Sequence, residues 1–153
     1  FVQGSRALLL KEETQKALVK KKINFSFFSS KLKNRKNSIH SKILSSVFSN
    51  KKNHIQGIKS CNLAFFREDC MNVNGFNNDF KGWGREDSEF VVRLINNGLK
   101  RKNLRFNAIQ FHLWHNENNR QMLNKNNLLL EKAINDSLIR CDNGIDRVND
   151  YES

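Results

Sequence analysis

The sequence predicts an α/β fold, and three segments carry this prediction. The compact apolar run Asn62–Phe66 is typical of a buried strand, and Leu104–Trp114 has the character of a second strand. Between them, Glu86–Asn97 has the apolar stripe of a helix with one buried face. That stripe consists of Phe90, Val91, Leu94 and Ile95. With 153 residues and twelve Phe, the chain can build one domain around a modest core.

The first part of the chain predicts a short strand, a helix and then an insertion. Residues 1–22 carry the apolar run Ala7–Leu10 and then an acidic and apolar helical pattern. Residues 23–56 are rich in Ser, Lys and Asn, with Phe interspersed, and we expect a weakly structured basic insertion. One short helix is expected within it, around Ser41–Phe48.

The elements after the Asn62–Phe66 strand follow from their glycines and their periodicity. A short helix is expected up to Gly75, which would be its left-handed C′ residue. Residues 77–84 predict a loop, and Gly98 closes the helix that follows. A further helix is expected over about 118–139, and residues 141–153 predict a polar, frayed tail.

Positive charge is concentrated in one stretch of the chain. The formal net charge is +12, and no acidic residue occurs from Thr14 to Arg67. Such a block favours an anionic partner: nucleic acid, an acidic membrane surface or phosphorylated substrates. A solvated basic loop without a partner is the alternative. The block contains Lys16, Lys20, Lys21, Lys22, Lys31, Lys33, Arg35, Lys36, Lys42, Lys51, Lys52, Lys59 and Arg67.

Cysteine usage and hydropathy indicate a cytoplasmic protein. The three cysteines, Cys61, Cys70 and Cys141, are odd in number and form no CxxC pair. This pattern argues against a disulfide scaffold or a zinc ribbon and favours reduced thiols. No apolar run approaches the roughly 20 residues that span a bilayer. The basic block makes a peripheral contact with an anionic inner membrane an expected partner.

The segment Gly82–Asp87 is the strongest candidate for chemistry. Its Gly-Trp-Gly loop leads directly into a helix that opens with two carboxylates, Glu86 and Asp87. Glycines allow a tight turn that leaves the Trp83 indole free to pack on a sugar. The carboxylates can accept hydrogen bonds from hydroxyls, and one can act as a general base. Alternatively, the carboxylates only complement the helix dipole and Trp83 lies in the core.

A second candidate is the His112-Leu113-Trp114-His115 segment at the end of the predicted strand. Two histidines at a strand end can ligate a divalent metal. His-x-x-His is a weak pattern by itself, and a structural role for both rings is the alternative.

In combination, these segments resemble a known family. The motifs are Ser60–Phe65, Val73–Phe76, Phe80–Asp87, Val92–Leu94 and Phe111–His115, in that order. Together they are similar to the C-terminal region of bacterial family 2 glycosyltransferases. They also resemble the galactosyltransferase-type C-terminal domain of β-1,4-galactosyltransferases and chondroitin polymerases. The resemblance covers roughly residues 57–120 and implies the C-terminal, acceptor-side half of a GT-A fold, a mixed sheet flanked by helices.

The resemblance implies a role for each residue of the Trp83–Asp87 segment. Asp87 would be the general base that deprotonates the acceptor hydroxyl, and Glu86 would bind acceptor hydroxyls. Trp83 would form a mobile platform over the sugars, with Gly84 and Arg85 also binding substrate. The implied reaction transfers a sugar from a UDP-sugar to a glycan or lipid-linked glycan with inversion, in surface polysaccharide synthesis.

The resemblance also implies a donor and metal side of the site. Cys61 and Asn62 would lie near the donor sugar. His112 or His115 would complete a site for Mn²⁺ or Mg²⁺, which neutralises the departing diphosphate. The implied division of the chain is 1–22 as the end of the nucleotide-binding half, 23–56 as the basic insertion, 57–140 as the acceptor-binding catalytic region and 141–153 as the polar tail.

The chain departs from the family pattern in several places. Ser60 and Ser88 stand where the family often has glycine and a third carboxylate. The strand-ending acid-x-acid pair and the uridine pocket are absent, and we expect them before Phe1. The chain alone is therefore expected to be an inactive fragment of a metal-dependent hexosyltransferase.

A rival hypothesis assigns the basic block to single-stranded nucleic acid. Lysines would contact phosphates, and the interleaved Phe25, Phe27, Phe28 and Phe48 would stack on bases. No recognisable nucleic-acid motif accompanies this composition.

Overall fold

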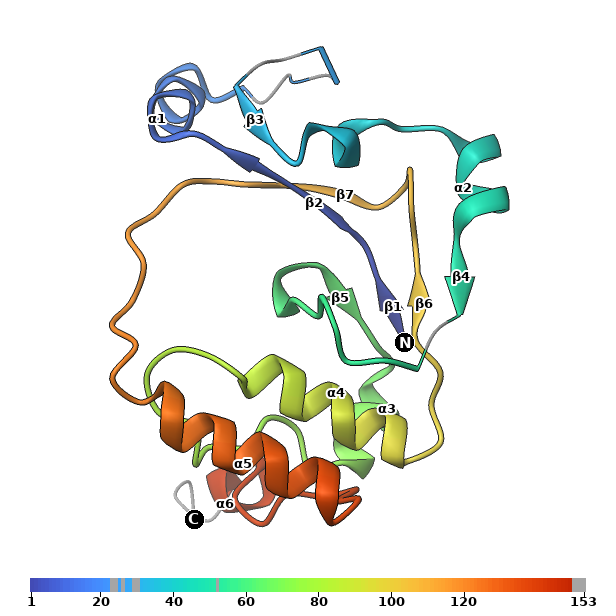
Figure 1. Ribbon diagram of the computed structural model, residues 1–153, viewed down its shortest axis with the longest axis vertical. Coiled ribbons are helices and arrows are strands. Elements are labelled where there is room, and N and C mark those ends of the chain that lie inside the picture. Colours follow the sequence, from blue (N-terminus) through green and yellow to red (C-terminus); the bar gives the residue numbers. More distant parts are fainter. Residues whose placement is uncertain (23–24, 26, 29–30, 52, 150–153) are drawn as a thin grey trace. The chain divides into compact units, whose positions relative to one another are not determined.

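The computed structural model describes residues 1–22, 25, 27–28, 31–51 and 53–149 (Figure 1). The chain forms two compact units. The sheet unit comprises residues 2–51 and 102–117, and the helical unit comprises residue 1, 52–101 and 118–153. Parts of the expected 23–56 insertion and of the expected tail lie outside the described residues: 23–24, 26, 29–30, 52 and 150–153.

The sheet unit contains short parallel and antiparallel strand pairs. Strand β2 pairs in parallel with β7, so that Leu8 lies opposite His112, and β3 pairs antiparallel on the other side of β2. Strand β1 pairs in parallel with β6, and β4 pairs antiparallel with β6. The elements are β1 Val2–Gln3, β2 Ser5–Leu9, α1 Lys11–Lys20, β3 Leu32–Lys33, a 3-10 helix at Arg35–Ser38, α2 Lys42–Phe48, β4 Asn50–Lys51, β6 Lys102–Asn103 and β7 Ile109–His112.

A small apolar core joins β2 to α1. Ala7, Leu9, Ala17 and Leu32 are buried together, and Phe111 packs against them. Because β2 alternates buried and partly buried side chains, its inward face meets the inward face of α1. The expected strand and helix within residues 1–22 are thus confirmed.

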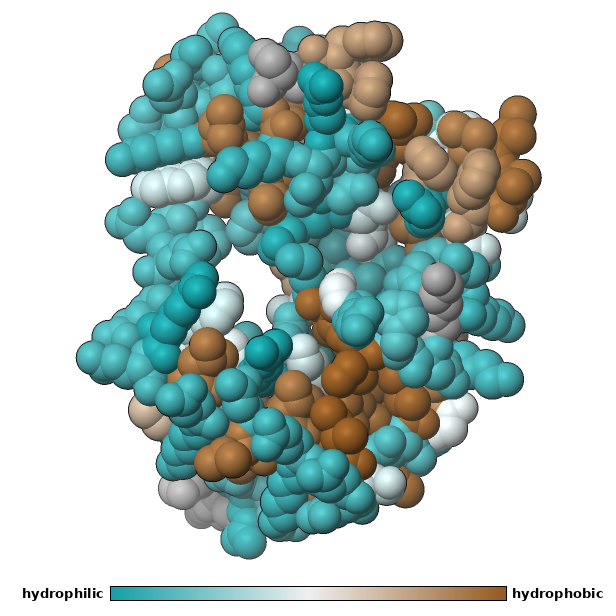
Figure 2. All heavy atoms as spheres, in the orientation of Figure 1, coloured by the Kyte–Doolittle hydropathy of each residue, from teal (hydrophilic) through white to brown (hydrophobic). Residues whose placement is uncertain are grey.

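The expected short helix in the basic insertion is also confirmed. Ser41 caps α2, because its Oγ accepts a hydrogen bond from the Leu44 N–H at 3.2 Å. The helix leaves Ile43 and Val47 exposed, and Figure 2 shows apolar residues gathered over α2.

The helical unit packs α4 against α5. Its elements are a 3-10 helix at Ser60–Asn62, β5 Leu63–Ala64, α3 Arg67–Asn72, α4 Glu86–Asn96, α5 Leu123–Asn135 and α6 Ile145–Asn149. One core cluster surrounds Phe90 and Leu94 of α4, and a second joins Val92 to Leu130 and Ala133 of α5. The expected helix over 86–97 is confirmed, and the strands and helices together confirm the α/β class with mixed strand pairing.

A buried ion pair fixes α4 to the segment after α3. Arg93 is fully buried and donates to both Glu89 carboxylate oxygens, at 2.7 and 2.9 Å. It also donates to the carbonyl of Val73 and, at 2.8 Å, to that of Gly75. The guanidinium therefore has its charge and its donors satisfied inside the core.

Four expected elements differ from the structure in their bounds. The strand at 62–66 shrinks to Leu63–Ala64, because Asn62 belongs to a 3-10 turn and Phe66, 79% exposed, precedes α3. The strand at 104–114 shortens to Ile109–His112, because Phe106 and Ala108 adopt left-handed backbone angles.

The helix expected over 118–139 ends at Asn135, because Ser137 is left-handed and terminates it. The helix expected to end at Gly75 ends earlier as well. Its left-handed C′ residue is Asn74, whose N–H donates to Met71 while Gly75 N–H donates to Cys70.

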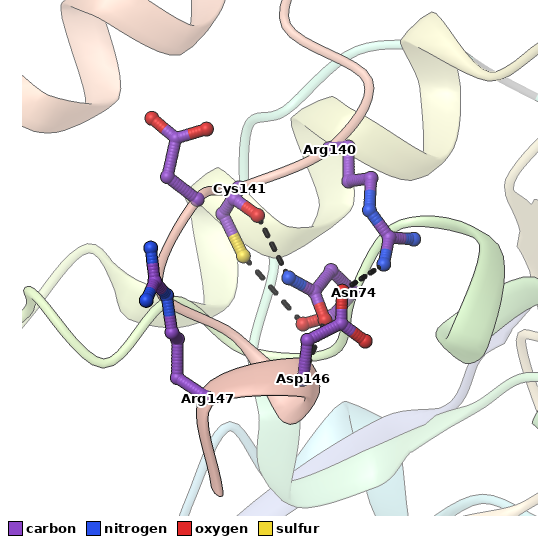
Figure 3. Close-up of a pocket in the computed structure, with 6 residues that line it drawn as sticks. Asn74, Arg140, Cys141, Asp146 and Arg147 are labelled. Atoms are coloured by element: carbon purple, nitrogen blue, oxygen red, sulfur yellow. Dashed lines mark hydrogen bonds and ion pairs between the residues drawn. The ribbon is translucent and has the colours of Figure 1, made fainter. Parts of the chain in front are cut away.

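The segment expected as a polar tail contains buried groups. The Cys141 side chain is 5% exposed, and α6 follows it. Asn74 donates to the Cys141 carbonyl at 2.9 Å and accepts from the Asp146 N–H at 3.0 Å. These contacts join residues 141–146 to the end of α3 (Figure 3). In the part of the chain that the structure describes, no helix has the length and apolarity to cross a bilayer.

Candidate active site

The Gly-Trp-Gly loop of the helical unit is held in a backbone conformation that most side chains disfavour. Gly82 and Gly84 have φ angles of +68° and +105°, which are left-handed values that glycine adopts without strain. A Cβ at Gly84 would also approach the Leu123 side chain to 3.1 Å. Arg85 is left-handed too, with φ 79°, and its Nε donates to Asn127 Oδ1 at 2.7 Å. Strain of this kind in a non-glycine residue is typical of functional sites.

A buried asparagine of α5 fixes this loop. Asn126 is fully buried, and its Nδ2 donates to the carbonyls of Lys81 at 3.1 Å and Gly84 at 2.9 Å. Sequence reasoning missed this residue. The sequence does contain a signal for its burial. Asn126 is followed at i+4 and i+7 by the apolar residues Leu130 and Ala133, which places it on the apolar face of the helix.

The Trp83 ring stands at the surface of the loop. Its side chain is 39% exposed, and the Arg120 guanidinium lies 4.7 Å from the ring centroid. The hypothesis that Trp83 belongs to the core is therefore wrong. A half-exposed indole stacked with a cation retains a face that can pack on the C–H groups of a sugar.

The two carboxylates that open α4 have different surroundings. Asp87 Oδ2 accepts from the Ser60 N–H at 3.1 Å, and Ser88 Oγ lies 3.3 Å from Asp87 Oδ1. Glu86 Oε2 is buried and has no hydrogen-bond partner among the described residues. A buried acceptor without a donor is costly, and a bound hydroxyl would supply one. Glu89, by contrast, is committed to Arg93.

The Ser60 contact brings a second predicted segment to the start of α4. Cys61 and Asn62 follow Ser60 in the same 3-10 turn, and both are half-buried. The turn that was expected near the donor sugar is therefore anchored at Asp87 by one backbone hydrogen bond.

The two histidines lie in the sheet unit and contact each other. His112 ends β7, and its Nε2 is 3.2 Å from His115 Nε2. His115 Nδ1 lies 2.9 Å from the Asn116 carbonyl, which can only accept. A hydrogen bond to this carbonyl requires a proton on His115 Nδ1, and in the neutral ring Nε2 is then the acceptor.

The segment between the histidines is held by α1. Trp114 N–H donates to Thr14 Oγ1 at 2.8 Å, and the Lys11 ammonium lies 4.8 Å from the Trp114 ring centroid. These contacts fix Trp114, which lies between the two histidines in the sequence.

The histidine pair can supply two ligands to a metal. Their Nε2 atoms lie 3.2 Å apart, so both rings could reach one divalent ion. No group of three or more His, Cys, Asp or Glu residues able to hold a metal occurs among the described residues.

A separate polar pocket of about 510 Å³ contains none of the predicted site residues. It is lined by Asn74, Arg140, Cys141, Asp142, Asp146 and Arg147 (Figure 3). Arg140 pairs with Asp146 across it, and burial raises the pKa of the Cys141 thiol. The charges within this pocket are therefore largely matched by one another.

Comparison with known proteins identifies a matching family model. A family model described as the N-terminal domain of galactosyltransferase matches residues 42–116. This range includes every candidate site residue, from Cys61 to His115. No curated protein and no solved structure matches the chain.

The match supports a galactosyltransferase-like domain and a glycosyltransferase enzyme. It lends no support to the nucleic-acid hypothesis. The assignment to the C-terminal half of a GT-A fold is not supported by the family description, and it stays a prediction.

Proposed function

We propose that this chain carries the acceptor side of an inverting glycosyltransferase that uses a UDP-sugar, with Asp87 as its general base. The observation that carries the proposal is the pair of carboxylates that opens α4 beside the exposed Trp83, within the matched segment. Glycan or lipid-linked glycan hydroxyls are the proposed acceptors, in the synthesis of a surface polysaccharide. The C-terminal half of a GT-A fold is the proposed architecture.

The proposed roles follow from the surroundings of each carboxylate. Asp87 receives a backbone N–H on one oxygen, which orients the carboxylate. It would accept the proton of the attacking hydroxyl. Glu86 would accept a hydrogen bond from a second hydroxyl, which would satisfy its buried Oε2. Trp83 would pack on the sugar ring, and Asn126 keeps the loop that carries Trp83 in position.

The histidine pair is the proposed protein contribution to a Mn²⁺ or Mg²⁺ site. Bound metal would neutralise the departing diphosphate as a Lewis acid. His115 is the better proposed ligand of the two, because a hydrogen bond from Nδ1 to the Asn116 carbonyl leaves the lone pair of the neutral ring on Nε2. His112, whose Nε2 contacts the same nitrogen, is the proposed second ligand and would bind in the tautomer that carries its proton on Nδ1.

The test measures UDP release by the protein that carries this chain, with a panel of UDP-sugars and glycan acceptors. We expect turnover that requires Mn²⁺ or Mg²⁺ and stops when the metal is chelated. His115→Ala should raise the Mn²⁺ concentration needed for half-maximal activity by about ten-fold or more, while the melting temperature changes little. His40→Ala, an exposed histidine of the same unit, is the matched control.

Two results would contradict the proposal. Full turnover in the presence of a chelator would remove the metal from the mechanism. Equal metal requirements in His112→Ala, His115→Ala and His40→Ala would mean that the pair has a structural role only.

A further inference from the structure

The two units differ sharply in charge. The sheet unit contains fourteen Lys and Arg and three acidic residues, which is a formal charge of +11. The helical unit contains thirteen Lys and Arg and twelve acidic residues, which is a formal charge of +1. Nearly all of the net charge of +12 therefore belongs to the sheet unit, whereas the Trp83–Asp87 segment belongs to the other. A charge this localised points to an anionic partner of the sheet unit.

Exposed apolar side chains accompany this charge at the end of α1. Leu18 and Val19 are 60% and 84% exposed, although they lie in the last turns of a regular helix. Residues 20–22, all lysines, follow directly and are exposed as well. The buried face of α1 is instead formed by Glu13, Thr14 and Ala17. Aliphatic and cationic side chains are thus both exposed at the end of α1.

A cationic pocket lies beside the end of α1. It has a volume of about 480 Å³ and is lined by Lys16, Lys20, Lys22, Lys31, Glu13, Ala17 and Phe25. Glu13 pairs with Lys16 at 3.1 Å and with Lys31 at 3.3 Å. One carboxylate against four ammonium groups leaves the pocket strongly positive. An anionic headgroup of lipid size would match that charge.

The same unit also exposes an aromatic pair. Phe28 is 88% exposed, and its ring centroid lies 5.4 Å from that of Phe27. The Arg35 guanidinium lies 5.6 Å from the Phe27 ring centroid. Aromatic rings among cationic groups are favoured at the boundary between headgroups and acyl chains.

We propose that the basic surface formed by residues 18–22 and Lys31 docks the sheet unit on an anionic lipid bilayer. The lysines supply attraction to the negative surface, and Leu18 and Val19 enter the interface. The aliphatic pair favours a bilayer over nucleic acid, because Leu and Val side chains provide no ring on which bases stack. The proposal does not depend on the transferase activity.

The experiment is flotation of the 153-residue chain with vesicles of phosphatidylcholine, with and without about one third phosphatidylglycerol. We expect binding only to the anionic vesicles, with a steep fall as salt rises. Changing residues 20–22 to Gln should weaken binding by at least about ten-fold. Leu18→Ser with Val19→Ser should also weaken binding, and this loss should persist at low salt.

The matched control removes the same charge from the helical unit. Lys100, Lys125 and Lys132 are exposed there, and changing all three to Gln should alter binding by less than about three-fold. Equal loss in the two triple variants would show a nonspecific effect of net charge and overturn the proposal. Failure of the wild-type chain to float with anionic vesicles at low salt would also overturn it. A third result would also overturn the proposal: the chain binds a single-stranded oligonucleotide in a salt-dependent way but does not bind vesicles. In that case Leu18→Ser with Val19→Ser would leave the oligonucleotide binding unchanged.

Discussion

Asn126 is expected to be the residue outside the loop that most strongly stabilises the Gly-Trp-Gly conformation. The perturbation is Asn126→Ala, which removes the two hydrogen bonds from Nδ2 to the carbonyls of Lys81 and Gly84. The side chain is fully buried, but the loop that it holds is partly exposed. Water can therefore partly solvate the carbonyls of Lys81 and Gly84 after the amide is removed.

The magnitude follows from these contacts. A net hydrogen bond contributes about 1 kcal/mol, so two lost bonds predict a loss of about 2 kcal/mol in the free energy of unfolding. Asn126→Asp should cost more than Asn126→Ala, because a carboxylate would face two carbonyl oxygens without a donor. Asn124→Ala, an exposed residue in the same helix, should change the free energy by less than about 0.5 kcal/mol.

The assay is urea unfolding followed by circular dichroism, together with Trp83 fluorescence in a Trp114→Phe background. The local fluorescence should change in Asn126→Ala while the helical signal before unfolding is retained. The reasoning would be refuted if Asn126→Asp were as stable as the wild type. It would also be refuted if Asn126→Ala and Asn124→Ala unfolded at the same urea concentration.

Two further perturbations test the interior of the helical unit. Glu89→Ala leaves the Arg93 guanidinium buried without its counterion, and a loss of about 3–5 kcal/mol in the free energy of unfolding is expected. Urea unfolding checks this value, and a loss below about 1 kcal/mol would contradict a buried ion pair. Burial raises the pKa of the Cys141 thiol, so we expect iodoacetamide to modify Cys141 more slowly than Cys61. Mass spectrometry of digested peptides measures the two rates, and faster modification of Cys141 would contradict this expectation. Because the folded-state pKa is the higher one, the stability linked to this thiol is present below its ordinary pKa and is lost as the pH rises through the folded-state value.

The sequence predicted the elements whose signals are local. The apolar stripe of α4 is a property of neighbouring residues, and this helix forms where it was expected. The helix α2 also forms within its expected range. The ends of the strand at 104–114 could not be predicted, because the left-handed positions are occupied by Phe106 and Ala108 and not by glycine, the residue that usually indicates them. The end of α3 likewise depended on Asn74 adopting the conformation that was expected of Gly75.

The residue types of the candidate site could be predicted from the sequence, but the contacts that hold these residues in place could not. The Gly-Trp-Gly spacing and the adjacent carboxylates are visible in the sequence. The Asn126 amide, the Ser60 N–H and the Asn116 carbonyl act through contacts between segments that are distant in the sequence or through the backbone. Neither kind of contact leaves a periodic pattern. The roles of Asp87, Glu86 and the two histidines stay predictions.

The most direct test of the central claim is the turnover of Asp87→Asn in the protein that carries this chain, measured as UDP release. Asparagine preserves the shape of the side chain and an oxygen to accept the Ser60 N–H, so the melting temperature should change little. If Asp87 is the general base, turnover should fall by at least about 100-fold, the typical contribution of such a group. Turnover within about three-fold of the wild type would contradict the assignment of Asp87 as the catalytic base.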